Sequence, residues 1–242
     1  MNVYDSEIVA GLLKDCGYSE TSEINKADII FFNTCAIREK AEETVHNRLD
    51  SIHYLKKNNP HIILGVLGCM AQNLKNGLLE SKPYVDIILG PDSYRRIPDI
   101  IKDRKLKETH HVDTRLSKFD VYEDLLPSRK EGINGWISIS RGCDKFCTFC
   151  IVPFTRGRER SRSLKSIISE TKDAVSSGFV EITLLGQNVN SYRTESGSFA
   201  NLLQKVSEVD GVKRLRYMSP HPQDMGADIL EVMKNYDNIC NN

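Results

Sequence analysis

Three cysteines, Cys143, Cys147 and Cys150, lie within eight residues, spaced four and then three apart. Cysteine thiolates are the usual ligands of iron–sulfur clusters, and a four-iron, four-sulfur cluster normally takes four of them. A loop that supplies three cysteines therefore leaves one iron without a protein ligand. Because that iron can bind a small molecule, the spacing predicts a reactive cluster.

Two other kinds of site use part of this pattern. The pair Cys147 and Cys150 forms a C-x-x-C motif, which is also typical of dithiol redox proteins and of zinc sites. A structural zinc site needs a closed set of four ligands, and no further cysteine or histidine lies near this loop in the sequence. A dithiol motif has no use for Cys143. The cluster is favoured, and zinc or a plain thiol pair remain the alternatives.

The residues around these cysteines resemble a known family. The loop and the segment 151–162 behind it are similar to the radical S-adenosylmethionine (SAM) methylthiotransferases. Further segments match the same family: 1–7, 33–38, 67–72, 181–192 and 218–222. The likeness covers nearly the whole chain. Within the family it is strongest to the branch that acts on N6-isopentenyladenosine in tRNA.

The resemblance implies a radical reaction on tRNA. An electron from the three-cysteine 4Fe-4S cluster cleaves SAM to a 5'-deoxyadenosyl radical, which removes hydrogen from C2 of N6-isopentenyladenosine beside the anticodon. A methylated sulfur, delivered at a second, auxiliary 4Fe-4S cluster, completes the thioether, and a second SAM supplies the methyl group. Side-chain acid–base catalysis cannot remove this non-acidic hydrogen, so a cofactor must carry the step. The implied partners are tRNA and an electron donor protein.

Other functions remain open at this point. A sister methylthiotransferase that acts on threonylcarbamoyl-adenosine or on a ribosomal-protein aspartate would use the same clusters. A function of another class is a non-catalytic, metal-containing RNA-binding module, and an inactive fragment is a third. Iron, sulfide and deoxyadenosine assays separate these hypotheses.

The elements that position the cysteines form two α/β units. In the first unit, short apolar runs predict strands buried on both faces, and longer polar stretches between them predict helices. The predicted strands are 28–34, 62–67 and 85–89, and the predicted helices are 37–58 and 71–81. This alternation predicts a doubly wound parallel sheet in an N-terminal domain of residues 1–115.

Cys35 and Cys69 each follow a predicted strand directly. The carboxyl ends of parallel strands share one edge of the sheet, so these cysteines are expected to meet there. The resemblance implies that they are ligands of the auxiliary cluster. It also implies a third cysteine two residues before the Met1-Asn2 pair, on a first strand. The sequence begins at this motif, so we expect the first strand and its cysteine to be missing from it. Their absence predicts a fragment or a start assigned too late.

The second unit follows a predicted linker at 116–132 and covers residues 133–242. Its predicted strands are 136–140, 180–185 and 213–218, and its predicted helices are 164–177, 198–209 and 226–236. The cysteine loop follows the first of these strands, where (β/α) barrels carry their chemistry. The resemblance implies a partial six-stranded barrel, of which about half lies in this chain.

Several residues near this rim are candidate contacts for SAM. By position and by resemblance they are Phe149, Gly186, Gln187, Asn188, Ser219 and His221. A glycine directly after a strand, such as Gly186, permits close backbone approach to a ligand, although a plain turn has the same requirement. His221 lies between two prolines, and a structural or surface role is equally compatible with that position.

Four arginines alternate behind the cysteine loop, at Arg156, Arg158, Arg160 and Arg162. In extended backbone they would share one face, which could follow the phosphates of RNA or contact the carboxylate of SAM. A solvated basic loop is the alternative.

Composition narrows the class of protein without naming a function. Lys plus Arg and Asp plus Glu both total 33, so RNA binding would need local clusters of charge. Seven unevenly spaced cysteines with no leader peptide are typical of reduced thiols or ligands in the cytoplasm. No apolar run reaches the roughly 18 residues of a membrane span. We therefore expect a soluble, cytoplasmic protein.

Overall fold

The N-terminal unit is built on a parallel sheet. The computed structural model describes residues 1–35, 39–107 and 109–240. The strands are β1 (Ile29–Thr34), β2 (Ile63–Gly68), β3 (Ile87–Leu89) and β4 (His111–Asp113), paired in that order and all parallel. The first three confirm the predicted strands, whereas β4 was not predicted.

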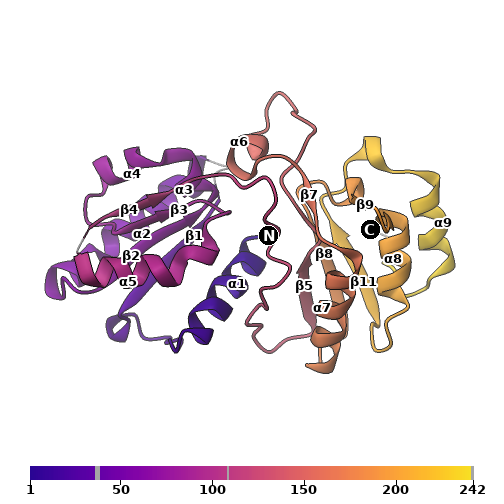
Figure 1. Cartoon of the computed structure of the whole chain (residues 1–242), viewed down its shortest axis with the longest axis horizontal. Helices are drawn as coiled ribbons and strands as arrows, with labels where there is room; N and C mark the ends of the chain where they lie inside the picture. Colours follow the sequence, from indigo (N-terminus) through magenta and orange to yellow (C-terminus); the bar gives the residue numbers. More distant parts are fainter. Residues whose placement is uncertain (36–38, 108, 241–242) are drawn as a thin grey trace.

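Helices cover both faces of this sheet (Figure 1). Helices α1 (Asn2–Asp15) and α5 (Ile97–Lys107) lie on one face, and α2 (Glu39–Asn58), α3 (Cys69–Leu74) and α4 (Asn76–Ser81) lie on the other. Alternate side chains of β2 contribute to the apolar cores on the two faces of the sheet. Ile63 and Leu67 pack on the face covered by α1 and α5, and Leu64 and Val66 pack on the opposite face. The prediction of a doubly wound sheet is confirmed.

Two predicted helices differ from the observed ones. The helix predicted at 71–81 is two helices, because Lys75 between them has a φ of 50° and interrupts the helical backbone. The helix predicted at 37–58 is observed from Glu39, since residues 37 and 38 lie outside the described residues. Two 3-10 turns, η1 (Ile24–Lys26) and η2 (Tyr94–Arg96), complete the unit.

The C-terminal unit contains a second parallel sheet. Its strands are β5 (Asn134–Ser138), β8 (Glu181–Leu185) and β11 (Arg214–Met218), in the order β11-β8-β5, and Ile239 forms a parallel bridge to Leu215. Helices α7 (Leu164–Ser176), α8 (Phe199–Ser207) and α9 (Ala227–Asn235) pack on it around one apolar core. Each predicted strand and helix of this unit is found, which confirms the partial barrel.

Short elements surround the cysteine loop. They are β6 (Ser140–Arg141), α6 (Val152–Arg156), β7 (Arg160–Ser161), η3 (Val189–Ser191), β9 (Arg193–Thr194), β10 (Gly197–Ser198) and η4 (Pro222–Asp224). Strand β6 pairs antiparallel with β7, so the predicted strand 136–140 is divided between β5 and β6.

The two units share an interface in which α1 is central (Figure 1). Tyr4 and Ile8 of α1 pack against Leu185 and Trp136 of the second unit. The described segment 114–133 has no helix or strand, yet its Tyr122 is buried. The Tyr122 hydroxyl donates to the carbonyl of Pro91 and accepts from the Tyr94 amide, both at 3.0 Å. The predicted linker is thus fastened to the first unit, and the domain boundaries stay a prediction.

In the part of the chain that the structure describes, no helix combines the length and the apolar character that crossing a bilayer requires.

Candidate functional site

Cys35 and Cys69 lie at the same edge of the N-terminal sheet. Thr34, the last residue of β1, pairs with Gly68, the last residue of β2, so the residues that follow both strands are neighbours. Gly68 has a φ of 93°, and a Cβ there would lie 2.5 Å from the Thr34 carbonyl oxygen. The predicted meeting of the two strand ends is confirmed, and the ligand role of the two cysteines stays a prediction.

The three-cysteine loop follows β6 and begins at a second glycine with positive φ. Gly142 has a φ of 79°, and a Cβ there would lie 2.1 Å from the Arg158 carbonyl oxygen. Cys143 is buried, and its sulfur accepts a hydrogen bond from the Lys145 amide at 3.5 Å. Cys147 and Cys150 are partly exposed, and all three thiols are free.

The thiols of this loop lie close enough to influence one another. Burial raises the pKa of the Cys143 thiol, the Lys145 amide opposes that rise, and negative charge on Glu159, Cys150 and Cys147 adds to it. A buried thiol whose ionisation is disfavoured by the neighbouring negative charge suits an inorganic cation or cluster that neutralises it. The donor chemistry of the loop therefore fits an iron–sulfur cluster.

Across residues 1–35, 39–107 and 109–240, no three His, Cys, Asp or Glu side chains surround a single point as the ligands of one ion would. The zinc alternative thus gains no support. A cubane binds each thiolate at a different iron, so its ligands lie further apart than those of one ion. The cluster prediction is not tested by this finding.

The loops after β8 and β11 are tied to the cysteine loop. The Gly142 amide donates to Gln187 Oε1 at 2.7 Å. Asp224 accepts from Asn188 Nδ2 at 2.6 Å and from Lys145 Nζ at 2.7 Å. These bonds bring two predicted SAM contacts, Gln187 and Asn188, to the cysteine loop.

The other predicted SAM contacts are placed differently. Ser219 and His221 are held at the same rim by hydrogen bonds of their backbone. The Ser219 carbonyl oxygen accepts from the Val189 amide at 3.3 Å, and the His221 amide donates to Asn190 Oδ1 at 2.7 Å. A Cβ at Gly186 would lie 2.7 Å from Ser140 Oγ, so internal packing alone accounts for this glycine. Phe149 is 91% exposed. Contact with SAM stays a prediction for all of them.

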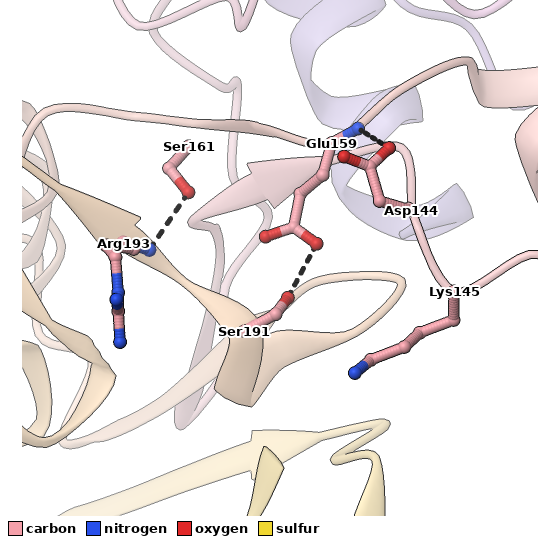
Figure 2. Close-up of a pocket in the computed structure, with 6 residues that line it drawn as sticks. All are labelled: Asp144, Lys145, Glu159, Ser161, Ser191 and Arg193. Atoms are coloured by element: carbon pink, nitrogen blue, oxygen red, sulfur yellow. Dashed lines mark hydrogen bonds between the residues drawn. The ribbon is translucent and has the colours of Figure 1, made fainter. Parts of the chain in front are cut away.

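A polar pocket of about 370 Å³ opens beside the cysteine loop. Its lining residues are Asp144, Lys145, Glu159, Ser161, Ser191 and Arg193 (Figure 2). Figure 2 shows the Glu159 carboxylate directed at Ser191, whose hydroxyl donates to it at 2.6 Å. Burial raises the pKa of Glu159, the Ser191 hydroxyl opposes that rise, and Asp144 and Asp224 add to it. Sequence reasoning missed this pocket, although Glu159 and Ser191 both lie in matched segments.

Three of the four arginines predicted to contact RNA are buried. Arg156, Arg160 and Arg162 are at most 8% exposed, and only Arg158 reaches solvent, beside Asp144. The assumption of continuous extended backbone is wrong, because Arg156 ends helix α6 and Gly157 has a φ of 71°. The prediction of one exposed basic face is therefore wrong for these three.

The buried arginines instead join the two units. Arg160 pairs with Asp92 of the first unit at 2.8 Å, and Arg162 donates to the Tyr4 hydroxyl of α1 at 3.0 Å. Arg162 also pairs with Glu170 of its own unit at 2.6 Å. The carboxylate of Asp5, in α1, accepts from Arg141 at 3.0 Å. Sequence reasoning missed this network, and its one signal was that Asp5 and these arginines lie in matched segments far apart in the sequence.

Arg156 connects this network to the N-terminal cysteines. Its Nε donates to Cys69 Sγ at 3.2 Å, and a terminal nitrogen donates to Asp5 Oδ2 at 2.7 Å. Burial tends to raise the pKa of Asp5, but Arg141 and Arg156 outweigh it and hold that pKa below its usual range. The helix that follows the three-cysteine loop thus contacts the edge that carries Cys69.

Comparison with known proteins agrees with this two-unit arrangement. The uncharacterized protein family UPF0004 matches residues 1–90, and the radical SAM superfamily matches residues 137–241. Over 99% of its length the chain is 46% identical to a tRNA-2-methylthio-N(6)-dimethylallyladenosine synthase of Bacteroides fragilis, and 45% identical to the enzyme of that name from Chloroherpeton thalassium. The chain belongs to the radical SAM methylthiotransferase family.

Members of the radical SAM superfamily use an iron–sulfur cluster and SAM, which agrees with the chemistry predicted from the cysteine loop. The chain spans about half the length of the curated relatives it matches, 54% of the Bacteroides fragilis enzyme and 53% of the Chloroherpeton thalassium enzyme.

Solved structures share the fold. The radical SAM methyltransferase TsrM from Kitasatospora setae superposes with a TM-score of 0.64 over 95% of this chain, at 13% identity with tryptophan and a SAM analogue bound and 14% with cobalamin and a [4Fe-4S] cluster bound. The chain covers 54% and 55% of those structures.

Proposed function

We propose that this chain carries the clusters of a tRNA methylthiotransferase, which adds a methylthio group to C2 of N6-isopentenyladenosine next to the anticodon. The names of the relatives at 43–46% identity support this substrate. The partners in this proposal are tRNA and an electron donor protein in the cytoplasm.

One observation carries the proposal: the Arg156 guanidinium, six residues after the last cysteine of the loop, donates a hydrogen bond to the sulfur of Cys69. Methylthiolation removes a hydrogen from a carbon and then attaches sulfur to that same carbon. The group that generates the radical and the group that delivers the sulfur must therefore lie near one substrate atom. Contact between the two cysteine regions supports this requirement.

In this proposal each cysteine region holds one group. Cys143, Cys147 and Cys150 hold a 4Fe-4S cluster, and Cys35 and Cys69 supply two ligands of a second one. When bound, the first cluster supplies the electron that splits SAM into a radical able to take hydrogen from carbon. The pocket beside the loop receives the polar part of SAM, where Glu159 accepts hydrogen bonds and Lys145 supplies positive charge.

The remaining residues hold these parts together. Gln187 fixes the start of the cysteine loop through the Gly142 amide, and Asp224 anchors Lys145 at the rim. Arg158 is the one predicted arginine that stays exposed, and we propose that it contacts tRNA phosphate.

The test is anaerobic reconstitution of the chain with iron and sulfide, followed by three measurements. Iron and sulfide content report the clusters, 5'-deoxyadenosine reports SAM cleavage, and mass spectrometry of tRNA nucleosides reports the methylthio product. A variant with Cys143, Cys147 and Cys150 all changed to Ala is the control. We expect SAM cleavage in the parent and none in the control.

Each alternative has a distinct result. Zinc without iron would replace the proposal with a metal-containing RNA-binding module. Product on threonylcarbamoyl-adenosine or on a ribosomal-protein aspartate, with none on isopentenyladenosine, would keep the chemistry and reject the substrate.

A further inference from the structure

Arg156 is the point at which the two cysteine regions touch. It lies six residues after Cys150, and 4% of its side chain is exposed. Two of its nitrogens are used, one on Cys69 Sγ and one on Asp5 Oδ2. The third, the other terminal nitrogen, is buried without a hydrogen-bond partner in the described part of the chain. A buried donor next to a sulfur needs an acceptor that the described residues do not supply.

The charges around Arg156 do not balance. Three buried arginines, Arg141, Arg156 and Arg160, meet two buried carboxylates, Asp5 and Asp92, among the side chains that the structure describes there. Each carboxylate is shared by two arginines, so one positive charge remains without a matching carboxylate. An uncompensated buried charge is strongly unfavourable.

The sulfur of Cys69 is the remaining group that can balance this charge. It lies 3.2 Å from Arg156 Nε, and Cys69 is buried. A cysteine that ligates iron is a thiolate, and an iron–sulfur cluster held by thiolates is anionic. An iron–sulfur cluster bound at Cys69 would thus supply the missing negative charge, and its sulfur atoms would be acceptors for the unpartnered nitrogen of Arg156.

The arginine is also held in a fixed direction. Asp5 belongs to α1, which packs against both units, and the planar guanidinium bridges Asp5 and Cys69 as a rigid fork. A lysine would keep the charge at this position but would lose the two-sided bridge.

We propose that Arg156 is a positioning residue for the second cluster. It donates hydrogen bonds to the Cys69 sulfur and to the cluster which that sulfur helps to hold, and so fixes this cluster to the radical SAM unit. The inference rests on the proposed function, because it requires iron at Cys69. A positive donor beside the cluster favours its more negative, reduced form, so Arg156 also raises the reduction potential.

The experiment isolates the second cluster. In the full chain, Cys143, Cys147 and Cys150 are changed to Ala so that only this cluster can form, and this parent is compared with Arg156→Met, Arg156→Lys and Arg162→Met. Arg162 is a matched control, since it is also buried and ion-paired at the interface of the two units, yet its hydrogen-bond partners among the described residues are oxygens. Measurements are iron and sulfide per chain, the rate of iron loss to a chelator, and the reduction potential.

We expect Arg156→Met to lose iron about tenfold faster than the parent, because residues hydrogen-bonded to metal ligands typically change metal affinity by about that factor or more, and to have a lower potential. Arg156→Lys is expected to fall between the two, and Arg162→Met to keep the parental potential. Equal retention and potential in the parent and Arg156→Met would overturn the inference alone. A parent without iron would overturn the proposed function as well.

Folding of each variant is checked by circular dichroism. If Arg156→Met does not fold, Arg156→Lys decides: parental retention and potential in that variant reject the role of the guanidinium, and faster loss with a lower potential supports it.

Discussion

The two cysteine regions are built in different ways. Cys143, Cys147 and Cys150 belong to one loop of eight residues, whereas Cys35 and Cys69 are brought together by the pairing of β1 with β2. The first region takes its three cysteines from that one loop, which Gly142 shapes and which Gln187 and Asp224 anchor. The second needs a folded sheet, helix α1 and an arginine from the other unit. The grouping of the first set of thiols is therefore set by local sequence, and that of the second set by tertiary structure.

Removing single cysteines gives the largest expected difference between the two regions. Cys143→Ala is expected to reduce deoxyadenosine formation to background, because the first cluster loses one of the three thiolates that leave a single iron open for SAM. Cys69→Ala is expected to leave SAM cleavage in place and to abolish the methylthio product. Deoxyadenosine and modified nucleosides are measured in the same reaction by mass spectrometry. An equal loss of deoxyadenosine in both variants would show that the regions do not act separately.

Asp5 tests how far the second region depends on the interface. Asp5→Asn leaves Arg141 and Arg156 without their shared carboxylate, and loss of one partner from a buried ion pair typically costs about 3–5 kcal/mol. We expect that loss in the free energy of unfolding, measured in urea. Asp124→Asn, at an exposed pair with Arg95, is the control and should cost about 0–1 kcal/mol. Similar values for both variants would mean that the buried network does not stabilise the protein.

The pH dependence of the stability difference between wild type and Asp5→Asn tests whether the Asp5 carboxylate is the stabilising group. Arg141 and Arg156 hold the pKa of Asp5 below its unfolded value of about 3.9, against the opposing effect of burial. Its contribution is therefore complete above the unfolded pKa and is lost as the pH falls through the folded pKa. The stability gap between wild type and Asp5→Asn should be constant from about pH 7 to pH 5 and narrow below about pH 4. Narrowing already between pH 7 and pH 6 would point to another group.

The same contrast explains what the sequence could predict. The apolar runs at 28–34 and 62–67 identified β1 and β2, and strand order then placed Cys35 beside Cys69. Nothing in the local pattern showed that Arg156, Arg160 and Arg162 are buried, because their partners Asp5, Asp92 and Glu170 come from distant parts of the chain or from a separate helix. Alternating charge resembles an exposed strand until the long-range partners are known.

Errors in the elements have a similar cause. Lys75 adopts a φ of 50° and divides the predicted helix, although its sequence neighbourhood carries no proline to announce a break. Glu159 and Ser191 were missed because their relation is purely spatial: they are 32 residues apart and meet across a pocket.

Two glycine substitutions test, with a smaller expected effect, whether the two cysteine regions retain iron independently. Gly142→Ala and Gly68→Ala each place a side chain at positive φ, which costs roughly 1–2 kcal/mol, and each adds a clash with a backbone oxygen. We expect Gly142→Ala to lower iron retention at the three-cysteine loop, and Gly68→Ala to leave that loop loaded. Gly77→Ala is the control, because a Cβ there meets nothing within 4 Å. Spectroscopy of each cluster distinguishes the outcomes, and loss of both clusters in Gly68→Ala would contradict the separation.

The smallest effect is expected at Arg158, the exposed member of the arginine series. Its side chain is 73% exposed, pairs with Asp144 at 2.7 Å and lies over the Phe146 ring. Exposed ion pairs contribute about 0–1 kcal/mol, so Arg158→Ala should unfold nearly as the wild type does. If Arg158 contacts a tRNA phosphate, Arg158→Ala will instead lower the affinity for tRNA. It will also reduce the slope of log K against log salt by about 0.7, the value for one single-strand contact.

The measurement is tRNA binding over a series of salt concentrations, with Lys172→Ala on helix α7 as an exposed control. A slope that changes in Arg158→Ala and not in Lys172→Ala would place RNA at the local cysteine loop. The same slope in both variants would remove the last predicted arginine from the RNA interface. In that case the whole series, Arg156 to Arg162, serves the protein's own charges, and tRNA recognition must come from other surfaces.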